Sequence, residues 1–157
     1  MARRSDHTRE ELKKMAILAG KELIVNEGFS KFSARKVAKS ICYTVGTVYN
    51  IFGSHEVLIL HINATTLEEM YGHILQATNK RQHVDRIKKL AAHYIEFAQK
   101  NYNSWSALFE FNLPQDIPLP EWYANKIKEL FTIIEQALMP LFHGNTKNLS
   151  SGLENEF

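Results

Sequence analysis

The helical spacing of its apolar residues is the feature that most limits what this chain can fold into. In one segment after another the apolar residues recur every three or four positions, which places them on one face of a helix. No segment shows the alternation of apolar and polar residues that indicates a half-buried strand. The sequence therefore predicts an all-α protein.

Capping residues and helix breakers divide the chain into separate helices. Thr8 and Glu11 form the pattern of a capping box before the first helix, and three prolines make residues 113–120 a loop. Pro140 and Gly144 should end the last helix and leave a polar tail. The expected helices cover about residues 8–28, 33–39, 44–52, 54–78, 84–101, 103–111 and 120–142.

Two of these helices carry more apolar residues than a single stripe needs. The helix at 84–101 has so wide an apolar face that we expect it to be largely buried. The helix at 120–142 should bury the stripe Tyr123, Ile127, Leu130, Phe131, Ile134 and Leu138. Further apolar residues should stay partly exposed until another molecule covers them. They are Ile95, Phe97, Ile133, Ala137 and Leu141.

Charge is distributed unevenly along the chain. Residues 1–52 carry a net charge of +5 and residues 53–157 a net charge of −3. A basic N-terminal third suggests a polyanionic partner, although ordinary solvated helix faces explain the same charges. The single cysteine, Cys42, excludes an intramolecular disulfide. Without a signal-peptide core or a membrane-spanning stretch, we expect a soluble, cytoplasmic protein.

Residues 33–52 have the organisation of a helix-turn-helix. A short helix, a four-residue turn and a second helix that starts at a hydroxyl-bearing cap follow one another. In such a unit the first turn of the second helix enters the major groove of DNA. Its side chains Thr44, Val45 and Thr47 are short enough to contact base edges. Tyr49 and Asn50, one turn further on, can reach phosphates.

These residues resemble the DNA-binding domain of the TetR family of bacterial transcriptional regulators. The matching segments are Gly28-Phe29, 33–38, 44–52 and 54–58, and together they cover about residues 12–60. The resemblance implies a helix-turn-helix domain at 1–55, a helical effector-binding and dimerisation domain at 56–143, and a polar tail at 144–157. The DNA-contacting residues that it implies, together with two arginines of the basic N-terminus, are Arg3, Arg4, Ser33, Arg35, Thr44, Val45, Thr47, Tyr49, Asn50 and His55.

Three departures from the family pattern affect the DNA-binding segment. Ile41 and Cys42 occupy turn positions where the family usually has alanine and glycine, and Ile51 stands where a phosphate-binding histidine or tyrosine is common. His55 replaces a lysine at the start of the fourth helix. A neutral imidazole anchors a phosphate less strongly than lysine does, so His55 predicts weaker and pH-dependent binding.

Aromatic residues are concentrated in the C-terminal part of the chain. The family resemblance implies an effector pocket there, and the candidate ligand-binding residues are Tyr94, Phe97, Trp105, Phe109 and Trp122. Plain core packing is the alternative for each of them. The resulting prediction is a DNA-binding transcriptional regulator, a repressor that a small apolar effector releases from its operator. The alternative is a constitutive or architectural DNA-binding protein without an effector.

No group of residues predicts an enzyme, a cofactor or a metal site. The seven histidines include no pair spaced by three or four residues, although helices far apart in sequence can converge. TetR-type regulators bind near-palindromic double-stranded DNA as homodimers, because their recognition helices must be about 34–36 Å apart. This chain is about two C-terminal helices short of that family, so we expect a weaker homodimer through its C-terminal helices. The operator, the regulated genes, the effector and the sign of regulation stay open.

Overall fold

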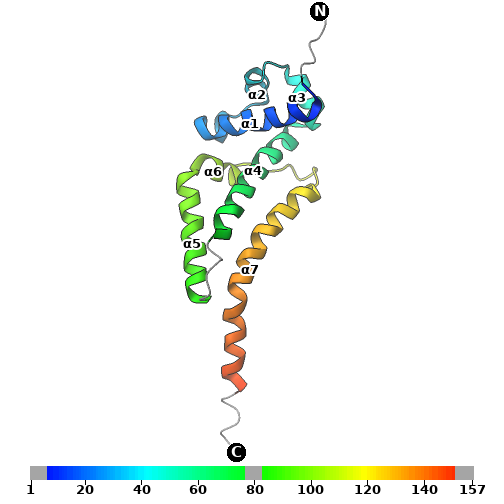
Figure 1. Cartoon of the computed structure of the whole chain (residues 1–157). Coiled ribbons are helices and arrows are strands. Elements are labelled where there is room, and N and C mark those ends of the chain that lie inside the picture. The colour runs from blue at the N-terminus through cyan, green and yellow to red at the C-terminus, as the bar shows by residue number, and fades with distance from the viewer. Residues whose placement is uncertain (1–6, 77–82, 151–157) are drawn as a thin grey trace, which may run out of the picture.

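The chain is helical throughout the part that the structure describes. The computed structural model describes residues 7–76 and 83–150, and it contains no strand within those ranges (Figure 1). The all-α prediction is confirmed. In chain order the elements are α1 (Arg9–Glu27), the 3-10 helix η1 (Phe29–Lys31), α2 (Ala34–Ser40), α3 (Val45–Phe52), α4 (His55–Leu75), α5 (His83–Lys100), α6 (Tyr102–Glu110) and α7 (Glu121–Ser150).

Side-chain caps fix the starts of the first four α-helices. Thr8 and Glu11 form the predicted capping box at α1. Ser33, Thr44 and Ser54 each accept a hydrogen bond from a backbone N–H in the first turn of the helix that follows, at 3.2 Å. These caps place α2, α3 and α4 where the sequence predicted them. The predicted helix at 54–78 ends at Leu75, and residues 77 and 78 lie outside the described residues.

The helices form two groups that share α4. In Figure 1, α1 lies across the base of α2 and α3, and these three helices form the head. The bundle consists of α4, which runs down from the head, together with α5, α6 and α7. Buried side chains form one core in each group. Leu58 and Ile62 of α4 belong to the core of the head, whereas Leu60 and Leu67 belong to the core of the bundle. A movement of α4 therefore affects both groups.

Close packing holds α1 against α4. A Cβ atom at Gly20 of α1 would overlap the side chain of Ile62, so the absence of a side chain allows this close approach. An ion pair between Lys21 and Glu69 joins the same two helices at their surface. None of the described helices is apolar over a length that could cross a membrane.

The last helix is longer than predicted. Pro140 lies inside α7, and the helix continues through Gly144 to Ser150. The predicted end of this helix near residue 142 is therefore wrong; residues 151–157 lie outside the described range. Proline removes one helical hydrogen bond and crowds the preceding turn, which costs about 3 kcal/mol, but it does not prevent a helix from continuing.

The buried faces of α5 and α7 also differ from the prediction. Phe97 is the only buried residue among those of α5 whose side chains are described, so the expectation that this helix is largely buried is wrong. Ile95 is exposed as expected, but Phe97, Ile133 and Ala137 are buried. Phe131, placed in the buried stripe, is 56% exposed. The buried face of α7 is shifted from the predicted one because Ile133, together with Tyr123 and Leu130, packs in one core with residues of α4. The side chain of Leu141 is not described.

Candidate nucleic-acid interface and apolar pocket

The outer face of α3 carries the side chains that the sequence assigned to DNA. Val48 and Phe52 anchor the helix in the core of the head. Of the predicted contact residues, Thr44, Tyr49 and Asn50 are exposed, and Val45 and Thr47 are half-buried. The packing of the inner face therefore fixes which side chains α3 presents to the outside.

Two threonine hydroxyls at the start of α3 are coupled to each other. Oγ1 of Thr44 accepts the backbone N–H of Thr47 at 3.2 Å and lies 3.0 Å from Oγ1 of Thr47. The cap therefore holds both side chains in one arrangement before any ligand binds. Preorganised polar groups of this kind lose little conformational entropy when they contact a base edge.

The turn between α2 and α3 contains the one described non-glycine residue with a positive φ. Cys42 has φ of +60° and is exposed. Its N–H donates to the carbonyl of Lys39 at 3.1 Å, and the N–H of Tyr43 donates to the carbonyl of Ala38 at 2.9 Å. This pair of bonds is a Schellman motif, in which the left-handed position favours glycine. The turn thus keeps the geometry that the motif requires although the residue is not glycine.

Two residues near the N-terminus hold the helix-turn-helix in place, and neither contact is apparent from the sequence pattern. The guanidinium of Arg9 donates to the carbonyls of Asn50 and Ile51, at 3.0 and 3.1 Å, at the C-terminal end of α3. Nδ1 of His7 lies 3.0 Å from the hydroxyl of Tyr43 in the turn. Arg9 was counted only as one more basic charge, because its partners lie about forty residues away. Its guanidinium satisfies two carbonyls at the C-terminal end of α3.

The remaining predicted DNA contacts lie around α3. Arg35 is exposed on α2, and the hydroxyl of Ser33 caps that helix. His55 is the first residue of α4, with its ring centroid 5.7 Å from that of Phe32. Arg3 and Arg4 lie outside the described residues.

The bundle contains a pocket with almost entirely apolar walls. It has a volume of about 480 Å³ and lies between α4, α5, α6 and α7. Leu67 and Met70 of α4 form one wall, and Leu90 of α5 forms part of another. The polar groups within reach are the hydroxyls of Tyr94 and Tyr123, and burial raises the pKa of Tyr123 against a weaker opposing effect of Asn63. A neutral, apolar small molecule suits such walls.

The five predicted ligand-binding aromatics separate into two groups. Tyr94 and Phe109 line the pocket. Trp105 lies behind Tyr94 and donates its indole N–H to the Tyr94 hydroxyl at 3.0 Å, which leaves the phenol O–H free to donate elsewhere. Phe97 is part of the bundle core, and Trp122 packs at the junction with the head. The pocket wall formed by Leu67 and Met70 of α4 was not predicted, because in the sequence these residues are indistinguishable from the buried stripe of any helix.

The fold has a counterpart among solved structures. No family profile matches the chain, and no curated protein matches it either. The crystal structure of PfmR, a TetR family transcriptional regulator from Thermus thermophilus, matches with a TM-score of 0.55 and 15% sequence identity. The match covers 90% of this chain and 74% of that one. This chain has the TetR-type fold.

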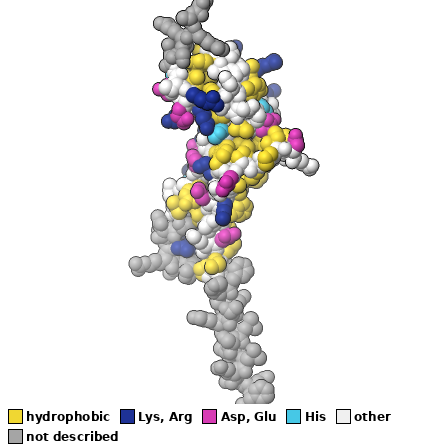
Figure 2. Space-filling view, turned by 90° about the vertical axis from the view of Figure 1, so that its right-hand side faces the viewer, with side chains coloured by type: hydrophobic (Ala, Val, Ile, Leu, Met, Phe, Trp, Pro, Cys, Tyr) yellow, Lys and Arg dark blue, Asp and Glu magenta, His cyan; other side chains and the backbone are white. Residues whose placement is uncertain are grey.

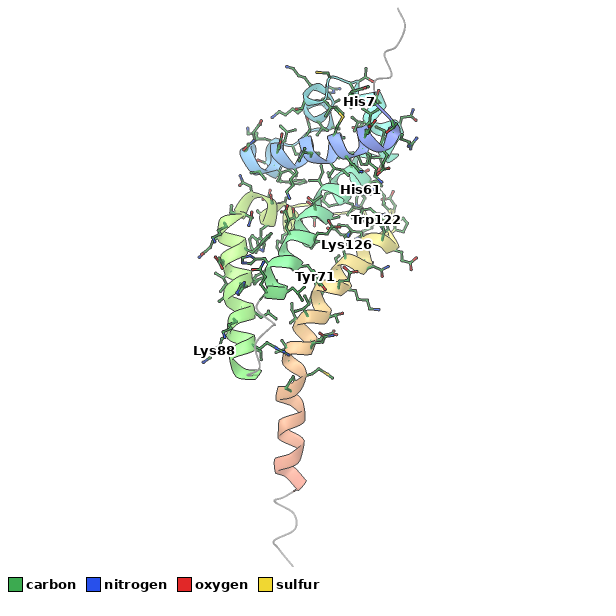
Figure 3. The ribbon with its side chains drawn as sticks, viewed as in Figure 1. His7, His61, Tyr71, Lys88, Trp122 and Lys126 are labelled. Atoms are coloured by element: carbon green, nitrogen blue, oxygen red, sulfur yellow. The ribbon has the colours of Figure 1, made fainter. Side chains whose placement is uncertain are left out.

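In this TetR-type fold, one connection between head and bundle is a stack of rings. The imidazole of His61 on α4 lies parallel to the indole of Trp122 on α7, with centroids 4.3 Å apart (Figure 3). On its other side His61 is 5.5 Å from the ring of Phe52 at the end of α3. Burial, helped by the charge of Lys13, lowers the pKa of His61 to about 4, against an opposing effect of Glu10. The ring is therefore neutral near pH 7.

A second connection of the TetR-type fold runs through α6. The side-chain amide of Asn103 donates to the carbonyl of Val25 near the end of α1, at 2.8 Å. Phe111, directly after α6, meets the ring of Phe29 edge to face, with centroids 6.2 Å apart. Both α6 and α7 line the apolar pocket, so each connection joins a pocket wall to the head.

Proposed function

We propose that this protein is a sequence-specific DNA-binding transcriptional regulator, a repressor that a small apolar effector releases from its operator. The observation that carries the proposal is the preorganised, outward-facing first turn of α3 on a TetR-type fold. The pocket in the bundle supports the effector, and the two connections to the head give it a route of action.

In this proposal, DNA is contacted by the two short helices of the head, by the N-terminal arginines and by the start of α4. Thr44, Val45 and Thr47 contact base edges in the major groove, where threonine hydroxyls hydrogen-bond and methyl groups touch thymine. The other residues in the proposal contact phosphates, which set the register without reading the sequence. They are Arg3, Arg4, Ser33, Arg35, Tyr49, Asn50 and His55.

Release follows from the position of the pocket. An effector between α4 and α7 pushes on Trp122 through α7, and the stack passes this displacement to Phe52 at the end of α3. A volume of about 480 Å³ lies within the range of roughly 300–1,000 Å³ that is usual for small-molecule sites. The effector shifts the population away from DNA because it binds the released arrangement more tightly than the bound one.

A homodimer through the C-terminal helices completes the proposal. Figure 2 shows hydrophobic side chains gathered on one face below the head. On the bundle helices, Ile95 of α5 and Phe131 and Met139 of α7 are 53–56% exposed. Covering such side chains by association is favourable. Two heads held in this way meet the half-sites of a near-palindromic operator, about 34–36 Å apart.

Binding-site selection with the purified chain tests the DNA-binding part. A random duplex library should yield a near-palindromic sequence, and a full site should bind more tightly than a half-site. Glu129→Ala, on the exposed surface of α7, is the control that should select the same site. Recovery of no preferred sequence would remove the regulator proposal.

A thermal-shift screen with small apolar compounds tests the effector part. A compound that fills the pocket should raise Tm because it binds only the folded chain. Leu67→Trp, which places an indole in the pocket wall, should abolish that shift. If selected DNA binds but no compound in a broad apolar set shifts Tm, the constitutive alternative is correct.

A further inference from the structure

Three potential metal-binding side chains meet near the end of α4. His73 lies on α4, and His93 and Glu96 lie on α5, three residues apart and therefore on one face of that helix. The two histidines are half-buried. His73 and His93 are twenty residues apart in sequence. They come together only because α4 and α5 pack side by side, so the spacing of histidines along the chain did not predict this cluster.

The ligand atoms are close enough for one ion. Each of the three residues offers one nitrogen or oxygen atom, and these atoms all lie within 4.8 Å of one another. Nε2 of His73 is 3.5 Å from a carboxylate oxygen of Glu96. Two ligands on a tetrahedral zinc ion with bonds of about 2.0–2.2 Å are separated by roughly 3.3–3.6 Å. Small side-chain rotations bring the whole set to that spacing.

Both imidazoles have a buried nitrogen without a hydrogen-bond partner. Nε2 of His73 and Nδ1 of His93 are inaccessible to solvent, and neither forms a hydrogen bond with any residue that the structure describes. A buried polar atom left without a hydrogen bond is energetically unfavourable. Two such atoms on neighbouring rings, whose centroids are 5.0 Å apart, indicate a missing shared partner that accepts electron pairs from nitrogen, which is what a metal ion does.

Lys100 orients the carboxylate. Its ammonium group donates to Oε1 of Glu96 at 2.5 Å, one helical turn away. The remaining oxygen, Oε2, faces His73. Lys100 is thus a positioning residue that holds the Glu96 carboxylate toward His73.

We propose that His73, His93 and Glu96 bind a divalent transition-metal ion of the zinc type. Two imidazole nitrogens and one carboxylate oxygen suit such an ion, whereas magnesium and calcium prefer oxygen ligands throughout. A water molecule completes the coordination. The ion clamps α4 to α5, and both helices line the apolar pocket through Met70 and Tyr94. The site is independent of the proposed DNA-binding function.

Cobalt(II) is the probe for the unmodified chain, since it replaces zinc in such sites and absorbs visible light. The full-length protein, first stripped with a chelator, should bind one equivalent of cobalt with ligand-field bands of imidazole and carboxylate ligation, and zinc should displace the cobalt. Zinc at a hundredfold excess over Kd should raise Tm by roughly 5–10 °C, and the chelator should reverse the rise. A folded protein that gives no bound-cobalt spectrum and no zinc shift overturns the proposal.

Single substitutions locate the ion. His73→Gln, His93→Gln and Glu96→Gln should each weaken cobalt binding at least about tenfold. His7→Gln, a histidine in the head, and Cys42→Ser, the exposed thiol, should bind like the unmodified chain. If His7→Gln or Cys42→Ser abolishes binding and the three cluster variants do not, the ion binds elsewhere and the assignment is wrong. Circular dichroism checks the fold of each variant.

Discussion

The head and the bundle are built from similar helices but are packed to different degrees. In the head, Ala16, Val37 and Val48 are completely buried, and four of its side-chain contacts serve only to fix α3 and its turn. In the bundle, α5 has a single buried residue among those whose side chains are described, and the helices enclose a pocket of about 480 Å³. This difference fits the proposed function, in which the head presents one fixed surface to DNA and the bundle leaves space for an effector.

The largest expected effect is that of salt on DNA affinity, and it tests the difference in charge between the head and the bundle. The basic N-terminal third should make DNA affinity fall by about a thousandfold or more between 50 and 200 mM salt if six or more phosphates are contacted. Replacement of Arg3 and Arg4 together should weaken binding to all sequences alike and reduce the slope. Fluorescence anisotropy across a salt series measures this. A flat salt dependence would mean that the head is not the DNA-binding surface.

The next prediction separates base contact from phosphate contact within the head. Thr47→Ala and Tyr49→Ala should each cost about 1–3 kcal/mol of binding to the selected operator. Thr47→Ala should change base preference more, because Thr47 lies in the first turn of α3, beside the Thr44 cap. Unfolding by urea should show little change, since neither side chain is fully buried. Unchanged affinity and preference in Thr47→Ala would place the recognition surface elsewhere.

Local chemistry explains why the head was predictable from sequence. Thr8, Ser33, Thr44 and Ser54 start their helices through hydrogen bonds to residues three positions away, so the pattern and the structure coincide. Arg9 was not predictable, because its partners lie on another helix and any of ten basic residues could have served.

The bundle was less predictable because it depends on how helices rotate against one another. The apolar residues of α7 allow more than one stripe, and only contact with α4 selects Ile133 and Ala137 over Phe131. Whether Pro140 ends the helix depends on the energy of the turns around it rather than on the proline alone. The cluster of His73, His93 and Glu96 exists only because α4 and α5 lie side by side.

A third prediction concerns the junction between the two groups. Because the folded pKa of His61 is about 4, below the usual 6.5, the unfolded chain takes up a proton that the folded chain does not. His61 therefore reduces stability as the pH falls from about 6.5 to about 4, and it adds nothing above pH 6.5. With allowance for partial exposure the loss is about 1–2 kcal/mol. His61→Phe keeps a ring against Trp122 and should lose this part of the pH dependence in urea unfolding; an identical pH profile in both proteins would contradict the stacked, neutral imidazole.

The smallest expected effect concerns the turn between α2 and α3 in the head. At the left-handed position of this turn stands a residue with a Cβ atom, for which that conformation is unfavourable. Cys42 adopts φ of +60° to complete the Schellman motif after α2. A left-handed conformation costs a residue with a Cβ atom about 1–2 kcal/mol, and glycine avoids this cost. Glycine also makes the unfolded chain more flexible, which offsets part of the stabilisation. Cys42→Gly should therefore stabilise the protein by up to about 1 kcal/mol, seen as a rise in Tm of a few degrees. Cys42→Ala, which also removes the thiol but keeps the Cβ atom, should give no such rise. If alanine stabilised as much as glycine did, the thiol rather than the backbone conformation would be the source of the strain.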